Sequence, residues 1–195
     1  GWLSSLLVFQ ASFHRASDRG LACHRTVAMQ MRVVAVFFAY VSLMQLYDYV
    51  FWTQPADGAL NRRVTQLAIL TNHTQPLVLL LCARYFLEKP LPVASSLTAL
   101  YTLVAIPYTL RALKVCTTTT LAAESKTPYW EWNHLRGEGH HVTYGFFLAS
   151  LFSVFWEGFE GPMRILFAAY TVGSFVFSWA KYRVHSSVGR FWCFF

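Results

Sequence analysis

The sequence has few charged residues, and this scarcity excludes most classes of soluble protein. Only 13% of its residues are Asp, Glu, Lys or Arg, whereas a soluble domain carries roughly a quarter. Hydrophobic residues make up 55% of the chain and aromatic residues 17%, a composition that is incompatible with intrinsic disorder. The composition predicts a membrane protein rather than an ordinary cytosolic enzyme.

The recognisable signatures of catalysis and metal binding are also missing. The four cysteines, at 23, 82, 116 and 193, lie far apart and form no C-x-x-C pair, so they predict neither a zinc site nor a disulfide framework. The sequence contains no G-x-S-x-G, P-loop, dinucleotide fingerprint or C-x-x-C-H motif. We therefore expect no cofactor and no catalytic residues.

Positive charge is in excess, with a net charge of +7. The basic residues are spread over all the polar segments and do not form one stripe. This distribution favours contact with anionic lipid headgroups over binding to nucleic acid.

Long apolar runs dominate what is present. Crossing the hydrocarbon core takes about 20 mostly apolar residues, and five segments come close to or exceed this length: 29–53, 63–86, 92–113, 142–158 and 163–182. They predict an all-α fold, a polytopic transmembrane bundle of about five to six spans over residues 29–195, with a long loop at 114–141. Residues 1–28 are expected to form a short or interfacial helix and a basic loop, with a transit segment as the alternative.

Several polar side chains interrupt these apolar segments. Gln45, Asp48 and Trp52 are spaced to share one face of a helix. An ionised Asp within a span costs about 2.5–3.5 kcal/mol on insertion scales, so Asp48 should face protein, pair with a partner or titrate at higher pH.

The next segment carries matching polar residues and a proline. Pro76 should kink its helix and free a backbone carbonyl, which at membrane depth must be buried in protein or line a cavity. A ligand or ion pocket and a closed hydrogen-bond network that only fixes packing are both compatible with this pattern. The candidate cluster comprises Gln45, Asp48, Trp52, Asn61, Thr65, Asn72, His73, Gln75 and Pro76.

Small and aromatic residues supply two further predictions. Small residues recur at helical spacing in the last two segments and predict the tightest helix contact there: Gly145, Ala149 and Ser153, then Ala169 and Gly173. Aromatic residues near the segment ends are expected to anchor in the headgroup zone: Tyr129, Trp130, Trp132 and Trp192. His134, Glu138, His140 and His141 lack zinc-ligand spacing and are expected to lie in a solvated loop without metal.

Five short elements, taken in order, resemble a family of uncharacterised multi-span proteins found in giant viruses, algae and other protists. These elements are M-Q-L-Y-D-Y-V-F-W at 44–52, Asn61, Q-P at 75–76, W-E-W at 130–132 and W-C-F-F at 192–195. The chain departs from the family in having Asp48 where Glu is usual and in lacking a Gly-His pair before Trp130. The resemblance implies an all-helical membrane bundle and marks Gln45, Asp48, Trp52, Asn61, Gln75 and Pro76 for a shared role, but it implies no known activity.

Three functions follow from these observations. We favour an accessory or structural subunit of a larger membrane complex, in an energy-converting organelle such as the inner mitochondrial membrane, with lipids and other membrane subunits as partners. The alternative is a small ion, proton or solute transporter or channel that uses Asp48, Asn72 and Gln75. An intramembrane hydrolase is disfavoured, because His73 is the only histidine well inside an apolar segment.

Overall fold

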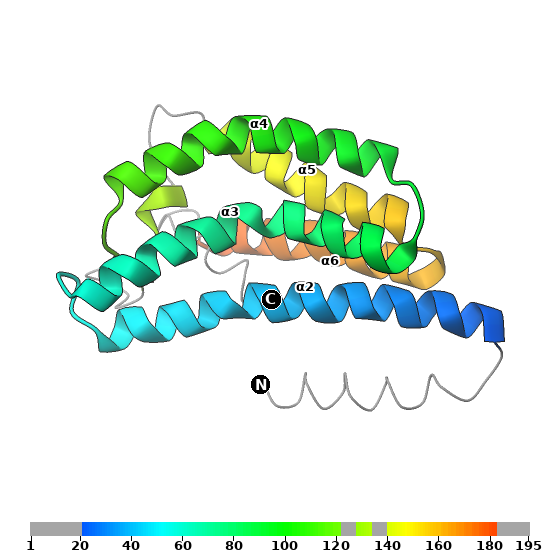
Figure 1. Ribbon diagram of the computed structural model, residues 1–195, viewed down its shortest axis with the longest axis horizontal. Coiled ribbons are helices and arrows are strands. Elements are labelled where there is room, and N and C mark those ends of the chain that lie inside the picture. Colours follow the sequence, from blue (N-terminus) through cyan, green and yellow to red (C-terminus); the bar gives the residue numbers. More distant parts are fainter. Residues whose placement is uncertain (1–20, 122–127, 134–139, 183–195) are drawn as a thin grey trace.

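A computed structural model describes residues 21–121, 128–133 and 140–182, and most of these residues are helical (Figure 1). The described residues form five α-helices: α2 (Leu21–Thr53), α3 (Ala59–Leu87), α4 (Pro92–Val115), α5 (His140–Gly158) and α6 (Gly161–Tyr182). The predicted all-α class is confirmed, and each of the five apolar segments lies inside one helix.

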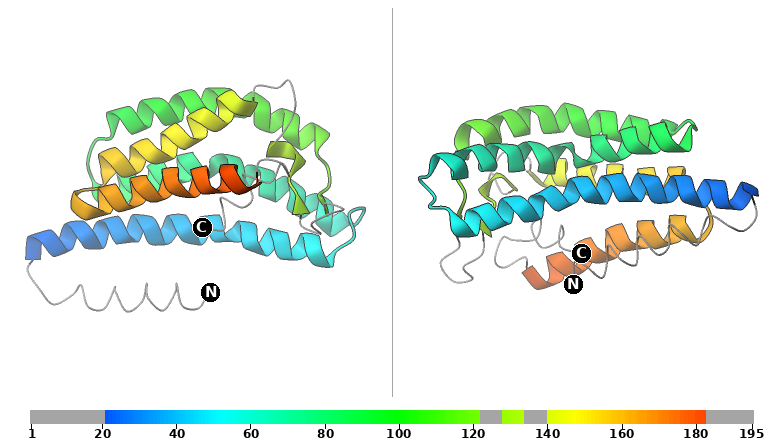
Figure 2. Two further views of the ribbon diagram at one scale, coloured as in Figure 1. Left: turned by 180° about the vertical axis from the view of Figure 1, so that it is seen from behind. Right: turned by 60° about the horizontal axis from the view of Figure 1, so that its bottom comes forward.

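The helices lie side by side with their long axes nearly aligned, and successive helices run in opposite directions (Figures 1 and 2). α3 is central and packs against α2, α4 and α5. α6 packs on α5, and its Phe167 and Tyr170 also contact Phe38 of α2. The main core consists of apolar side chains from α2 to α5.

α2 begins earlier than the sequence indicated. Residues 21–28, which we expected to belong to a basic loop, form the first two turns of this helix. Arg25 and Arg32 are exposed, so their charges point away from the bundle and do not interrupt the helix. The expected helix over residues 1–13 lies outside the described residues.

The α4–α5 connection, residues 116–121 and 128–133 in the described chain, is more ordered than the predicted loop. β1 (Thr120–Leu121) pairs antiparallel with β2 (Pro128–Tyr129), with Thr120 opposite Tyr129. A short 3₁₀ helix, η1 (Glu131–Asn133), follows. These elements lie at the end of the bundle where α3 begins and α4 ends (Figure 1).

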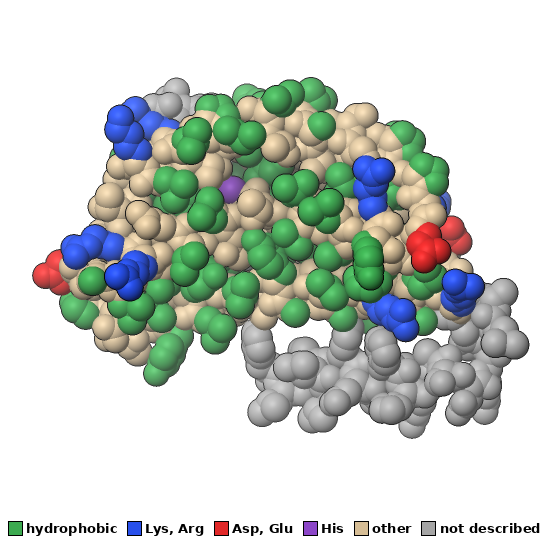
Figure 3. Space-filling model, in the orientation of Figure 1, with side chains coloured by type: hydrophobic (Ala, Val, Ile, Leu, Met, Phe, Trp, Pro, Cys, Tyr) green, Lys and Arg blue, Asp and Glu red, His purple; other side chains and the backbone are tan. Residues whose placement is uncertain are grey.

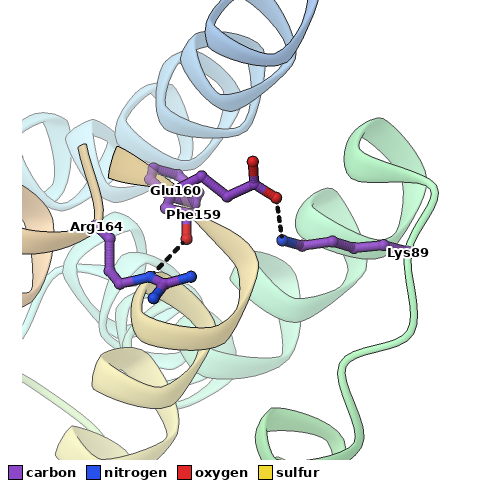
Figure 4. Close-up of polar contacts among 4 residues, drawn as sticks. All are labelled: Lys89, Phe159, Glu160 and Arg164. Carbon is purple, nitrogen blue, oxygen red and sulfur yellow. Dashed lines mark hydrogen bonds and ion pairs between the residues drawn. The ribbon is translucent and has the colours of Figure 1, made fainter. Parts of the chain in front are cut away.

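At the opposite end, polar contacts join the α3–α4 turn to the end of α5. Leu91, the residue before α4, has no side chain that can accept a hydrogen bond from the first turn. The Glu157 carboxylate of α5 accepts the Val93 and Ala94 N–H groups instead, at 3.3 and 2.8 Å, so α5 caps the N-terminus of α4. Lys89 pairs with Glu160 at 3.2 Å, and the Arg164 Nε–H donates to the Phe159 carbonyl at 2.9 Å (Figure 4).

The predicted small-residue contact between the last two helices is wrong. Gly145 and Gly173 have open space where a side chain would stand, and Ala169 is exposed. Phenylalanine side chains make the contact instead, because Phe167 of α6 stacks on Phe155 and meets Phe159 edge-on, with ring centroids 5.3 and 5.5 Å apart. Phe155, Phe159 and Phe167 thus occupy the contact between the last two helices in place of the predicted small residues.

The outer surface is strongly apolar. Among the described residues, two helices are long and apolar enough to cross a membrane, over Arg25–Thr53 and Pro92–Val115, and only 28% of each apolar window is buried. Green side chains cover much of the face shown in Figure 3, while charged side chains gather towards its two ends. Residues 64–83 and 90–110 contain no charged side chain.

Candidate functional site

The buried carboxylate of Asp48 is the centre of the candidate site. Asp48 lies about one and a half turns before the end of α2 and is 1% exposed. The indole Nε1–H of Trp130, from the α4–α5 connection, donates a hydrogen bond to its Oδ1 at 3.1 Å. The predicted inward orientation of Asp48 is thus observed, and a residue 82 positions later in the sequence supplies a partner.

Trp130, which binds this carboxylate, forms a stacked pair with Trp132. Their ring centroids are 5.5 Å apart with an angle of 17° between the rings, and both side chains are buried. The Tyr108 hydroxyl of α4 donates to the Trp132 carbonyl at 2.7 Å. The prediction that these tryptophans are interfacial anchors is wrong, because Asp48 offers an acceptor inside the bundle and the rings pack in the core. Tyr129 is half-buried, and Trp192 lies outside the described residues.

Asn61 fixes the other part of the connection. Its side-chain Nδ2 donates to the Thr119 carbonyl and its Oδ1 accepts the Thr119 N–H, both at 3.0 Å. The hydroxyls of Thr65 and Thr119 are 2.9 Å apart. The amide of Asn61 therefore pairs with the backbone as a neighbouring strand would, and all three residues are buried.

These contacts bring together three of the five sequence elements on which the family resemblance rests. We call this group the end cluster; its members are Asp48, Asn61, Thr65, Tyr108, Thr119, Trp130 and Trp132. The hydrogen bonds of Asp48, Asn61, Thr65 and Tyr108 described in this section each join α2, α3 or α4 to the α4–α5 connection. A further hydrogen bond at 3.3 Å, between the Thr65 hydroxyl and Asn61 Oδ1, lies within α3. The arrangement holds the connection against the end of the bundle.

The other predicted polar residues form a separate group near the middle of α3. Thr65 and Gln75 are ten positions apart in this helix, which corresponds to about 15 Å along its axis, so the predicted single cluster is divided. Asn72, His73, Gln75 and Pro76 are buried here. The Tyr101 hydroxyl of α4 donates to the His73 carbonyl at 2.6 Å, one turn before the proline, and His73 Nδ1 lies 2.8 Å from Thr109 Oγ1.

Gln45 and Trp52 take no central part in either group. Met44, Asp48 and Phe51 form the buried face of α2 in this region, while Gln45 is half-buried and Trp52 is exposed. The helix is rotated by about one residue from the orientation that the polar spacing predicted, because the large apolar side chains of Met44 and Phe51 determine which face turns inward.

Cys116 adjoins the end cluster and is also buried. Burial and, to a smaller extent, the negative charge of Glu131 raise the pKa of its thiol to about 11. A thiol in this environment stays protonated at neutral pH, which makes it a poor nucleophile and a poor metal ligand.

The described part of the chain holds no group of three or more His, Cys, Asp or Glu side chains placed to bind a metal ion. His140 and His141 begin α5 and therefore do not lie in a loop. His134 and Glu138 lie outside the described residues. Comparison of the chain with family models, curated proteins and solved structures finds no match.

Sequence reasoning missed four residues that matter here. Tyr108, Thr119 and Glu157 act through contacts with segments far away in the sequence, and Trp130 was expected at the membrane surface. A partial signal exists for Trp130, since an indole donor suits a carboxylate that must be buried. The other three contacts follow only from the fold.

Proposed function

We propose that the chain is an integral membrane protein whose five described helices cross the bilayer, and that it serves as an accessory structural subunit of a larger membrane complex. The uncharged stretch 64–83 of α3 spans about 30 Å along a helix axis, which matches the hydrocarbon thickness of a bilayer. The stretch 90–110 covers a similar length in α4. Charged residues flank both stretches.

The observation that carries the membrane proposal is the exposure of large apolar side chains around the helices. Leu81, Leu103 and Ile165 are each more than half exposed, at 56%, 69% and 65%. A soluble protein that exposed so many residues of this kind would be prone to association. α3 has lower hydropathy than α2 and α4 because of its Thr, Asn, His and Gln residues, but most of these are buried against its neighbours, so its polar residues are compatible with a membrane location.

The structural role is supported by the way the buried polar groups are used. Asp48 is bonded to Trp130, and Asn61 makes two bonds to Thr119. These bonds hold the α4–α5 connection against α2 and α3, which is a structural use of the buried polar groups. We favour the membrane of an energy-converting organelle as the location, because the chain is small, basic and rich in aromatic residues.

Native purification tests this proposal. The full chain, tagged at one end, is extracted from carbonate-washed membranes in a mild detergent, and co-purifying proteins are identified by mass spectrometry. We expect the chain to resist carbonate and to elute with a defined set of membrane subunits, which are lost in a parallel purification in a harsh detergent. Release by carbonate would contradict the membrane location, and a stable lone monomer in mild detergent would contradict the subunit role.

One observation favours transport as the second candidate. Gln75 Nε2 and Thr98 Oγ1 are buried and have no hydrogen-bond partner in the described part of the chain, and unpaired polar groups inside a bundle are typical of hydrated pathways. Proton flux in liposomes tests it. Flux that falls in Asp48→Asn and Gln75→Leu but not in Asp57→Asn would support transport, and absence of flux from the wild-type protein would remove it.

A further inference from the structure

His73 is held by α4 from three directions. Its Nδ1 lies 2.8 Å from Thr109 Oγ1, and its backbone carbonyl accepts the Tyr101 hydroxyl at 2.6 Å. Its ring meets that of Tyr108 edge-on, with centroids 5.6 Å apart. The imidazole therefore has a fixed position and a fixed orientation before anything binds to it.

These contacts use only one of the two ring nitrogens. Nε2 of His73 has no hydrogen bond to any residue that the structure describes. The hydrogen bond between Nδ1 and the Thr109 hydroxyl can run in either direction; the site proposed below takes the tautomer in which Thr109 donates, which puts the ring proton on Nε2. A rigidly held N–H donor is thereby left without an acceptor in apolar surroundings, which is unfavourable unless something binds there.

This donor borders the outer surface of the bundle. Figure 3 shows a hollow between α3 and α4, and the His73 side chain lies between these two helices, since it contacts Thr109 and Tyr108 of α4. His73 is 8% exposed, which is compatible with that position. Leu70 and Leu77 lie one turn before and after it on the same face of α3, and both are exposed, as is Ile106 of α4.

We propose that this hollow binds a neutral, membrane-soluble molecule whose ring or chain carbonyl oxygen accepts a hydrogen bond from Nε2 of His73, a quinone being the chemical class that fits. The ligand must provide an acceptor, because Nε2 carries the proton. It must also be apolar, because Leu70, Leu77 and Ile106 border the site.

The depth of His73 excludes the carbonyls of ordinary phospholipids. His73 lies at the middle of α3 and of its uncharged stretch 64–83, about 14 Å along the axis from either end of that stretch. Ester carbonyls lie at the edge of the hydrocarbon core and do not reach this level. This step rests on the proposed membrane location, whereas the free Nε2–H and the hollow do not.

The test measures binding of decyl-1,4-benzoquinone to the full-length protein in detergent micelles, with decylbenzene as the matched probe that lacks carbonyls. We expect saturable binding of the quinone to the wild type and about tenfold weaker binding to His73→Phe. The control His141→Phe, which changes an exposed histidine in the first turn of α5, should bind the quinone as the wild type does. Equal affinity of the wild type for both probes, or unchanged quinone affinity in His73→Phe, would overturn the proposal.

A second measurement keeps the test valid if His73→Phe does not fold. In ¹⁵N-histidine-labelled wild-type protein, the quinone should shift the Nε2 resonance of His73 and decylbenzene should not; no shift, or equal shifts, would refute the site. Both measurements are made in micelles without other subunits. They therefore do not depend on carbonate resistance or on co-purification, and failure of the proposed function would be distinguishable from failure of the site.

Discussion

A hydrogen bond from a distant indole helps to explain how a carboxylate is tolerated inside an apolar helix. Asp48 is buried and accepts a hydrogen bond from the Trp130 indole N–H. A buried donor that loses its acceptor costs about 1–3 kcal/mol. The buried carboxylate and the buried indole therefore satisfy each other's need for a hydrogen-bond partner.

Substitutions at Asp48 test this pairing. Asp48→Leu should lower the free energy of unfolding by about 1–3 kcal/mol, because the Trp130 N–H loses this acceptor. Asp48→Asn should change it much less, since the amide oxygen still accepts the bond. Thermal unfolding in detergent, followed by tryptophan fluorescence, measures both effects. The exposed Asp57→Asn is the control, and an Asp48→Leu variant as stable as the wild type would show that the bond is dispensable.

The environment of Cys116 makes a prediction about reactivity. With a pKa of about 11 rather than 9.0, its thiolate fraction at pH 8 is about a hundredfold smaller than that of an ordinary cysteine. In a variant whose other three cysteines are serine, iodoacetamide should label the folded protein slowly at pH 8 and faster as the pH rises towards 11. Glu131→Gln should speed the labelling, because it removes a charge that raises the pKa. Labelling at the rate of the unfolded chain would contradict this account.

At the scale of elements, the helices could be predicted and the connection between α4 and α5 could not. The apolar runs 63–86 and 92–113 coincide with α3 and α4 to within four residues at each end, because burying or shielding the backbone in such a run requires a helix. The position of β1 and η1 depends on Asn61 and Asp48, which are distant in the sequence. No local pattern contains that information.

The capping of α4 by α5 is a testable feature of the same kind. Glu157→Ala should destabilise the protein by about 0.5–2 kcal/mol, because the Val93 and Ala94 N–H groups lose their acceptor. Hydrogen exchange should show faster exchange at these two amides in particular. Glu160→Ala removes a partly exposed ion pair with Lys89 and should cost less than about 1 kcal/mol. Equal exchange at both amides in the wild type and Glu157→Ala would show that the cap does not form.

At the scale of the whole molecule, the apolar exterior distinguishes a membrane bundle from a soluble one. Leu103 lies at the middle of α4 and is 69% exposed. A Lys at the centre of a spanning helix costs about 2.5–3.5 kcal/mol on insertion scales, whereas an exposed Lys on a soluble helix costs almost nothing. A Lys at position 103 should therefore be costly if α4 crosses a membrane and almost without effect if α4 faces water.

We expect Leu103→Lys to reduce the membrane-integrated fraction of newly made protein in microsomes, as measured by carbonate extraction. Leu60→Lys introduces the same side chain at an exposed position beside Arg62, at the end of α3, and should have little effect. If both variants integrate as the wild type does, α4 does not lie across the hydrocarbon core.

The candidate site shows where sequence reasoning reaches its limit. The cost of burying a charge correctly placed Asp48 inside the bundle. The carbonyl that Pro76 leaves without its helical N–H partner belongs to Asn72, four residues earlier, and Asn72 is buried in protein as the proline rule required. The spacing of polar residues could not show that Thr65 and Gln75 belong to different groups, because both share a face of α3 but meet different partners along it. The small residues at 145 and 173 misled for a similar reason, since spacing within one helix does not show what faces it, and phenylalanine rings make the contact between α5 and α6 instead.

The link between Asp48 and Trp130 also constrains the order of events during synthesis. The ribosome completes α2, α3 and α4 before it reaches residue 130, so the carboxylate lacks the indole donor throughout that interval. The hairpin of α2 and α3 is therefore made before this hydrogen bond can form. Emergence of Trp130 is then the step that allows the α4–α5 connection to be fastened to α2.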